Sequence, residues 1–252
     1  MSQPKRALIV LNPHESKRLI ARAVARLPEV QRALESGRVI IGHGSTNAYV
    51  AEEIIGAPVS KWRYSAGVIA SGRLDVTEND TRLPPFALKH GQPFEAGWIE
   101  LLQEFECGDV FIKGANALDP DGNVGVLLGS NIGGTVGHIF GIIAARGAHL
   151  IAPVSCGKLV PDVIEAAAHC GTTLDFADGL PVGMAVLTNA QVITEVETFE
   201  ILCGVQVWHV ASGGIAGSEG AVTLALEGPE LALKQAVDLA ESVSAEPPIT
   251  RD

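Results

Sequence analysis

The fold is decided by a stretch in the first fifth of the chain, Val39-Ile40-Ile41-Gly42-His43-Gly44-Ser45-Thr46-Asn47-Ala48-Tyr49. Its β-branched start predicts a short buried strand, and the two glycines predict a tight turn directly after that strand. Ser45 or Thr46 can cap the helix that we expect over residues 46–55. A strand, a glycine turn and a helix in this order form the repeating unit of parallel α/β sheets.

The same alternation continues along the chain. Short apolar runs predict further strands at residues 7–11, 38–41, 109–113 and 149–153. Helical spacing predicts helices at residues 16–27, 139–145 and 161–169, the first of them capped by Ser16. Buried strands separated by helices predict an α/β fold, specifically a Rossmann-like three-layer arrangement with helices on both faces of a parallel sheet.

The character of the chain changes near Asp178-Gly179-Leu180-Pro181. Two expected strands, at residues 205–210 and 222–226, follow each other with no helix between them, and a helix is expected from 229 to 243. We therefore expect an α/β ligand-binding domain over residues 1–180 and a small α+β subdomain over residues 181–252.

The composition of the chain argues against nucleic acids and membranes as binding partners. The chain has 252 residues, 47% of them hydrophobic, and a formal net charge of −11. That charge argues against nucleic acid, because a phosphate backbone needs a basic surface. The four cysteines form no CxxC pair, which is typical of reduced thiols in a cytoplasmic protein. No apolar stretch is long enough for a membrane span, and self-association stays open.

The glycine turn is the first candidate ligand site. Gly42, His43, Gly44, Ser45 and Thr46 would bring backbone N–H groups, two hydroxyls and the positive end of a helix dipole toward an anion. His43 could donate to a phosphate or act in acid–base chemistry. The turn is not a P-loop, because it lacks Gly-Lys-Ser/Thr. It is not the dinucleotide fingerprint either, since Asn47 stands at the third glycine position. An ordinary capped turn is the alternative.

Two further loops could contribute to a site. The stretch from Lys113 to Gly125, which contains Asn116, follows a buried strand, where open α/β sheets place ligands. The turn Gly133-Gly134-Thr135 opens a helix and would supply a second set of N–H donors. The alternative for both is a loop followed by a helix cap.

A third loop, residues 211–221, is rich in glycine and joins the two C-terminal strands. Glu219 is its one carboxylate, and the loop is interpreted as a lid, a second binding loop or a long hairpin connection. Among the histidines, His138 and His149 have no partner at the spacing of metal ligands, and no metal site is expected.

Taken together, the first two loops resemble the superfamily of ribose-5-phosphate isomerase, glucosamine-6-phosphate deaminase (NagB) and the CoA-transferases. Residues 42–46 resemble its phosphate-binding Gly-x-Gly-Ser-Thr turn, and residues 113–124 its second strand-end loop. Gly114-Ala115-Asn116-Ala117-Leu118 with Asp121-Gly122 is most similar to the LUD family, associated with lactate utilisation. The resemblance covers residues 35–155 and implies this fold with a pocket for an anionic ligand.

The sequence departs from that superfamily at residues that matter for catalysis. The sugar isomerases carry a Gly-Ala-Asp-Glu pattern in the second loop, where this chain has Asn116 and Ala117, so the proton-transferring carboxylate is absent there. Glu219 is a loose match to the glutamate nucleophile of CoA-transferases. Three functions therefore stay open: binding of a phosphorylated sugar, nucleotide or CoA-like ligand; an acyl or CoA transferase or thioester hydrolase using Glu219; and a non-catalytic sensor or assembly subunit. Whether the chain is an enzyme, and any cofactor, stay unassigned.

Overall fold

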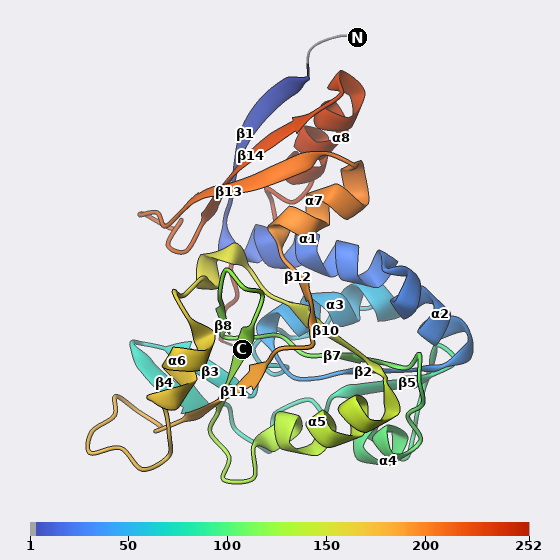
Figure 1. Ribbon diagram of the computed structural model, residues 1–252, viewed down its shortest axis with the longest axis vertical. Coiled ribbons are helices and arrows are strands. Elements are labelled where there is room, and N and C mark those ends of the chain that lie inside the picture. Colours follow the sequence, from blue (N-terminus) through green and yellow to red (C-terminus); the bar gives the residue numbers. More distant parts are fainter. Residues whose placement is uncertain (1–3, 252) are drawn as a thin grey trace.

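The centre of the fold is a six-stranded sheet in the order β12-β10-β7-β2-β5-β6, seen in a computed structural model that describes residues 4–251 (Figure 1). Its strands are β2 (Arg38–Ile41), β5 (Phe86–Lys89), β6 (Gln92–Pro93), β7 (Val110–Ile112), β10 (His149–Pro153) and β12 (Gln191–Ile193). Four neighbours, β12, β10, β7 and β2, run parallel, so their carboxyl ends meet at one edge of the sheet.

The prediction of a wholly parallel sheet is wrong at one side. β5 pairs antiparallel with β2, and β6 pairs antiparallel with β5. The chain between β2 and β5 supplies one helix, α3 (Ser45–Ile55), followed by a small hairpin of β3 (Gly67–Ala70) and β4 (Arg73–Val76). A strand that pairs parallel with the one before it needs a crossover connection, usually a helix that leads into it. Here a hairpin comes between α3 and β5, and β5 pairs antiparallel with β2. The fold is mixed α/β.

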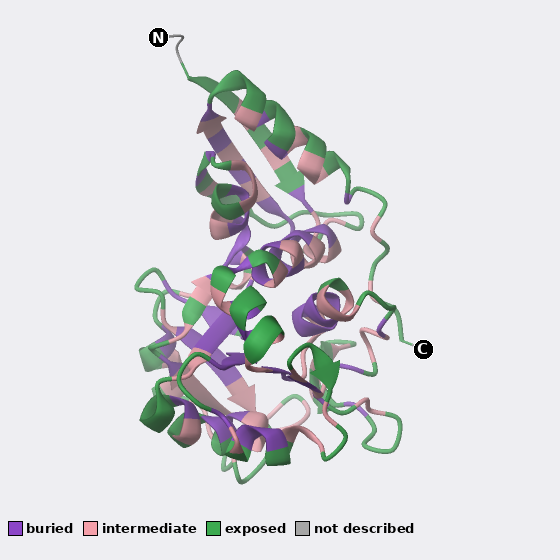
Figure 2. Cartoon of the chain, turned by 90° about the vertical axis from the view of Figure 1, so that its right-hand side faces the viewer, coloured by how far each residue is buried: buried purple, intermediate pink, exposed green. Residues whose placement is uncertain are grey.

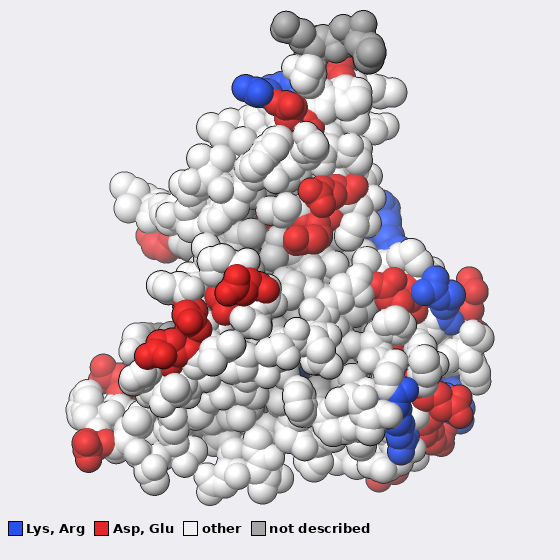
Figure 3. Space-filling model, in the orientation of Figure 1, with Lys and Arg blue, Asp and Glu red and all other residues white. Residues whose placement is uncertain are grey.

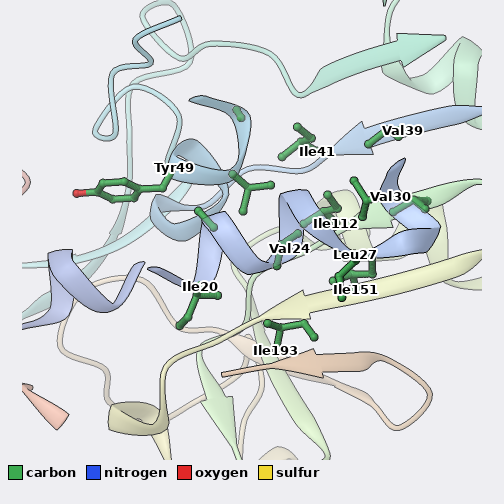
Figure 4. Packing of buried hydrophobic residues seen from close by; sticks show 14 of the residues in the cluster. Ile20, Val24, Leu27, Val30, Val39, Ile41, Tyr49, Ile112, Ile151 and Ile193 are labelled. Carbon is green, nitrogen blue, oxygen red and sulfur yellow. The ribbon is translucent and has the colours of Figure 1, made fainter. Parts of the chain in front are cut away.

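Side chains alternate across the large sheet and divide its core into two clusters. Val39, Ile41 and Ile112 pack in one cluster with the first three helices (Figure 4), whereas Ile40 and Phe111 pack in the other. The first three helices are α1 (Pro13–Arg26), α2 (Pro28–Ser36) and α3; the second cluster includes residues of α4 (Trp98–Gln103) and α5 (Gly134–Arg146). Figure 2 shows buried residues concentrated on the sheet and on the helix faces turned toward it.

The first helix begins earlier than the sequence predicted. Asn12, not Ser16, is the N-cap of α1, and Pro13 occupies the first turn. Glu15 accepts a hydrogen bond from the Asn12 N–H at 2.7 Å, which completes a capping box. Proline favours the first helical turn because it has no N–H to lose there, so Asn12-Pro13 starts the helix before Ser16 is reached.

A second sheet joins the two ends of the chain. β1 (Lys5–Leu11) pairs antiparallel with β14 (Val222–Gly228), which pairs with β13 (Gln206–Ser212). α7 (Glu195–Cys203) and α8 (Glu230–Glu241) complete this α+β unit. The expected order of two strands followed by a helix is confirmed. The unit also includes the N-terminal strand, while β11 (Gly183–Leu187) and β12 pair with strands that precede residue 180.

The remaining elements surround the carboxyl edge of the large sheet. They are β8 (Ala117–Leu118), β9 (Val124–Leu128), the 3-10 helix η1 (Cys156–Lys158) and α6 (Val163–Ala168). β8, β9 and β11 form a small antiparallel sheet. Within residues 4–251, no helix combines the length and the apolar character that crossing a bilayer requires.

Candidate functional site

The glycine turn lies at the carboxyl end of β2, between two strand ends. Gly42 is buried and donates its N–H to the Ile112 carbonyl at 2.9 Å. A Cβ on Gly42 would come within 3.1 Å of the Phe111 ring, so only glycine fits there without a shift of its neighbours. Gly44 has φ 150° and ψ 148°, a conformation that is open essentially to glycine alone. Both glycines of the motif are thus required by the backbone path.

The turn leads into the open N-terminus of α3. Gly44 is the N-cap, and Ser45 and Thr46 are the first helical residues, so the prediction that one of them caps the helix is wrong. The first N–H groups of a helix have no intrahelical partner, and the cap supplies no side-chain acceptor. Ser45 is half-buried and Thr46 buried. This end of α3 therefore offers backbone donors, two hydroxyls and the positive end of a helix dipole.

The His43 side chain is fixed by two contacts. Its Nε2 lies 2.8 Å from the Leu83 carbonyl, and its ring meets Tyr64 edge-on at 5.7 Å between centroids. Burial lowers the pKa of His43; the positive charges of Lys113 and Arg82 lower it further, against the opposing effect of the Leu83 carbonyl. A ring whose Nε2–H donates to a carbonyl holds the turn in position, and its lowered pKa disfavours the positively charged form.

Asn47 forms hydrogen bonds to the ends of both β2 and β7, where the two candidate loops begin. The sequence did not indicate this role of Asn47. Its side chain is fully buried, and Nδ2 donates to the Gly42 carbonyl at 2.8 Å and to the Ile112 carbonyl at 3.1 Å. The Oδ1 atom has no partner among the described residues and lies against Gly114. Asn47 thus fixes the ends of β2 and β7 relative to each other and leaves one buried acceptor directed at the second loop.

Three lysines gather at the same edge of the sheet. Lys113 follows β7 and its Nζ donates to the His43 carbonyl at 3.1 Å. Lys158 ends η1 and its Nζ donates to the Ala115 carbonyl at 2.5 Å. Lys17, in the second turn of α1, is close enough to Lys158 to lower that group's pKa, as is Lys113. All three are half-buried, and within residues 4–251 none forms an ion pair with a carboxylate.

The electrostatics of this lysine cluster (Lys17, Lys113 and Lys158) are unfavourable without a counter-charge. Burial lowers the pKa of Lys113 to about 8. The pKa of Lys158 is lowered to about 8, chiefly by burial and also by the positive charges of Lys17 and Lys113. The negative charge of Glu195 opposes this decrease. Burial also lowers the pKa of Lys17. Crowded ammonium groups of this kind are relieved when an anion binds between them or when one gives up its proton.

These pKa values predict how anion affinity depends on pH. Sulfate does not titrate in the neutral range, so calorimetric titration with sulfate reports the protonation of the protein alone. Because binding needs ammonium groups and both pKa values are about 8, affinity should be highest below pH 8 and fall at least about tenfold by pH 10. The double replacement of Lys113 and Lys158 by Arg should flatten the profile, since arginine keeps its charge. An equally steep profile in that variant would exclude these amines as the cause.

The second loop is shaped by Asn116 and Asp119. Asn116 is exposed; its Oδ1 accepts the Leu127 N–H at 3.0 Å and its own N–H bonds the Gly125 carbonyl at 2.7 Å. Asp119 is buried and accepts from the N–H groups of Asp121, Asn123 and Val163 at 2.9–3.1 Å. Burial raises the pKa of Asp119, but these bonds outweigh it and lower the pKa. Both side chains therefore serve the loop's own structure.

The turn Gly133-Gly134-Thr135 opens α5, which packs in the cluster that does not include α1 or α3. Its backbone bonds stay local: Gly133 donates to the Ser130 carbonyl at 2.9 Å and accepts from the Gly137 N–H at 3.0 Å. No hydrogen bond in the described part of the chain connects this turn to residues 42–46 or to the lysine cluster.

The hairpin loop that contains Glu219 reaches the rim of the site. The Gly220 carbonyl would stand 3.1 Å from a Cβ on Gly157, and Pro13 lies 3.4 Å from a Cβ on Gly220. The loop is thus wedged between η1 and the start of α1. Glu219 itself is exposed, and its carboxylate accepts the Gly217 N–H of the same loop at 3.0 Å. The chain brings the loop, though not this carboxylate, to the site.

A buried glutamate lies behind η1. Glu195 is fully buried; its Oε2 accepts the Cys156 N–H at 2.8 Å, and its Oε1 has no partner among the described residues. Burial and the negative charge of Glu195 raise the pKa of the Cys156 thiol to about 12, so that sulfur stays protonated. Glu195 thus anchors the loop that carries Lys158.

The lysine cluster contrasts with the charge of the outer surface. In Figure 3, acidic side chains form separate patches at several places on the visible face, whereas the fewer basic ones lie near the top and along the right-hand edge. In a chain with net charge −11, three lysines without carboxylate partners at one sheet edge are a local departure from the overall charge. Comparison with known proteins adds no assignment: no family model matches this chain, and neither the curated proteins nor the solved structures contain a significant match.

Proposed function

We propose that this chain binds a small anionic metabolite, a phosphorylated sugar, a nucleotide or a CoA-like compound, at the carboxyl edge of β2, β7 and β10. The observation that carries the proposal is the lysine cluster beside the open end of α3. Ammonium groups and free helix N–H groups are the donors that phosphate accepts most strongly. The buried Oδ1 of Asn47, which has no partner among the described residues, is an acceptor at the same edge that a hydroxyl or N–H group of such a ligand could satisfy.

We propose further that the fold is the Rossmann-like three-layer arrangement of the isomerase, deaminase and CoA-transferase superfamily, nearest to the LUD family. The supporting observations are the strand–turn–helix path through residues 38–55 and helices from both core clusters packed on the large sheet. The proposed division assigns ligand binding to the unit built on the large sheet, with the α+β unit of β1, β13, β14, α7 and α8 as an appended subdomain. In this arrangement the ligand would lie where the parallel strands end.

The glycine turn can be tested by removing its hydroxyls. Ser45→Ala combined with Thr46→Ala should abolish the thermal shift that phosphate and a panel of sugar phosphates, nucleotides and CoA esters induce in the native chain. A ligand at 100 times its Kd stabilises a protein by about 2.7 kcal/mol, which is readily measured as a shift in Tm.

The matched control is Ser36→Ala, an exposed serine whose Oγ bonds only the Arg32 carbonyl of its own helix. It should leave every shift unchanged. If the native chain shows no shift with any member of the panel, or if the double variant shifts as much as the native chain, the proposal is wrong.

A second candidate is an acyl or CoA transferase, or a thioester hydrolase, with Glu219 as nucleophile. The contact of the 213–220 loop with Gly157 favours it, because a loop at the rim can carry a carboxylate to a bound thioester. Hydroxylamine trapping during turnover of a thioester panel would mark Glu219. A third alternative, a non-catalytic sensor or assembly subunit, would bind a panel ligand tightly and turn over none.

A further inference from the structure

We propose that Lys113 is a nucleophile that forms a reversible imine with the aldehyde or ketone group of a phosphorylated ligand. This inference rests on the proposed anion site and deepens it, because it names the ligand as a carbonyl compound that carries a phosphate. The geometry that carries it is an amine without a carboxylate partner, set at the end of a central strand beside the anion-binding turn.

Lys113 lies at the carboxyl end of β7, in the middle of the sheet edge where the ligand is proposed to bind. β7 is flanked by β2 and β10, so its end faces both neighbouring loops. The side-chain stem passes Gly42, where Cδ would be 3.3 Å from a Cβ, and Nζ reaches the His43 carbonyl at 3.1 Å. This single bond holds the amine next to the residues that open α3.

The other lysines are bound differently. Lys158, whose pKa is also lowered to about 8, differs in its contact: its Nζ donates to the Ala115 carbonyl of the second loop at 2.5 Å and not to the turn of residues 42–46. Away from the site, Lys89 pairs with Glu104 at 2.6 Å and Lys5 with Glu230 at 2.7 Å, and such pairing keeps an amine protonated. Lys113 has no such partner within residues 4–251, and its lowered pKa of about 8 supports a neutral fraction near physiological pH.

The step balances without an oxidant or a metal. The nitrogen lone pair of neutral Lys113 attacks the carbonyl carbon, and the C=O π electrons move to oxygen. The nitrogen then loses one proton to that oxygen, which gives a carbinolamine. A second proton, from the Lys158 ammonium, lets the oxygen leave as water while the nitrogen lone pair forms the C=N bond. The ligand phosphate stays at the N–H groups that open α3 throughout. A lysine amine beside other cations is a recognised form of activated nucleophile.

The probe for this inference is pyridoxal 5′-phosphate, which carries an aldehyde and a phosphate. The full chain is incubated with it at pH 8 and reduced with cyanoborohydride, and the modified lysines are located by peptide mapping. At pH 8 about half of the Lys113 amines are neutral, compared with well under one in a hundred for an ordinary lysine of pKa ~10.4. We expect Lys113 to be modified roughly 100-fold faster than the exposed Lys234, and inorganic phosphate to suppress its modification.

The matched variant is Lys113→Arg, which keeps the positive charge and removes the nucleophile. It should lose the adduct at the site, whereas Lys234→Met, at an exposed lysine on α8, should keep both the Lys113 adduct and the phosphate-induced thermal shift. Modification of Lys158 or Lys17 in place of Lys113, or a Lys113 rate equal to that of Lys234, would overturn the inference. If phosphate produces no shift in the native chain, the proposed function fails. If phosphate binds and Lys113 stays unmodified, only the imine fails.

Discussion

Replacing Lys113 and Lys158 together by methionine should lower phosphate affinity by at least about 100-fold. Each hydrogen bond from a charged group contributes about 1.5–3 kcal/mol, and two of them correspond to two or more powers of ten in Kd. Methionine keeps most of the apolar stem that both lysines pack at the sheet edge and removes only the ammonium groups. Isothermal titration calorimetry at pH 7 measures the change directly.

The same double variant should fold as stably as the native chain, or more so. The two amines repel each other and have no carboxylate partner among the described residues, so their removal relieves repulsion. Their folded pKa values of about 8 lie below the ~10.4 of an unfolded lysine. Between those two pH values the unfolded state binds more protons, so these groups make the free energy of unfolding rise with pH. Tm measured from pH 8 to 10 should show that rise reduced in the double variant.

Lys234→Met is the control for both measurements, because Lys234 is an exposed lysine on α8, away from the site. It should bind phosphate as the native chain does. Phosphate affinity within about threefold of native in the Lys113 and Lys158 double variant, with the native fold retained by circular dichroism, would contradict the role of the cluster.

The second large effect is a loss of folding stability when Asn47 is replaced. Asn47→Ala removes the donor that joins the Gly42 and Ile112 carbonyls and leaves a cavity at a fully buried position. Ile112 keeps the Gly42 N–H as a partner, whereas the Gly42 carbonyl loses its side-chain donor. An unsatisfied buried group costs about 1–3 kcal/mol, and with the cavity we expect a loss of about 2–4 kcal/mol in urea denaturation.

Asn47 has an internal comparison in the exposed Asn116. Asn116→Ala removes one bond to the Leu127 N–H at the surface and should cost less than about 1 kcal/mol. Asn47→Asp should be worse than Asn47→Ala, because it sets a carboxylate against two carbonyl oxygens, and part of that loss should return as the pH falls and the carboxyl is protonated. Equal stability of the Asn47→Ala and Asn116→Ala variants would show that the bridge between β2 and β7 is dispensable.

The strand–turn–helix core was predictable because its signals are local. An apolar β-branched run, glycines that the backbone requires and helical spacing all lie within residues 38–55. The pairing of β1 with β14 and the antiparallel entry of β5 were not predictable, since they depend on contacts between residues far apart in sequence. α1 starts before Ser16, the predicted cap, because Asn12 and Glu15 form a capping box and Pro13 favours the first turn.

The sequence predicted the glycine turn of the candidate site but not the lysine cluster beside it. Gly42 and Gly44 were identified from their spacing, but Lys17, Lys113 and Lys158 come from three separate segments, and only the fold shows that they are neighbours. The sequence does point to one of these lysines. Lys113 directly follows a buried strand, where burying a charged group costs free energy unless a partner or ligand compensates it. In the sequence, Asn47 only shows that the dinucleotide fingerprint is absent; its bridging role depends on two carbonyl groups that the fold brings together.

The most direct test of the anion site is a crystal of this chain soaked in selenate, whose selenium can be located by anomalous diffraction. We expect a selenate at the N-terminus of α3, within hydrogen-bond distance of the N–H groups of Ser45 or Thr46 and of Nζ of Lys113 or Lys158. An empty edge at saturating selenate, or selenium bound only at other places on the surface, would contradict the account.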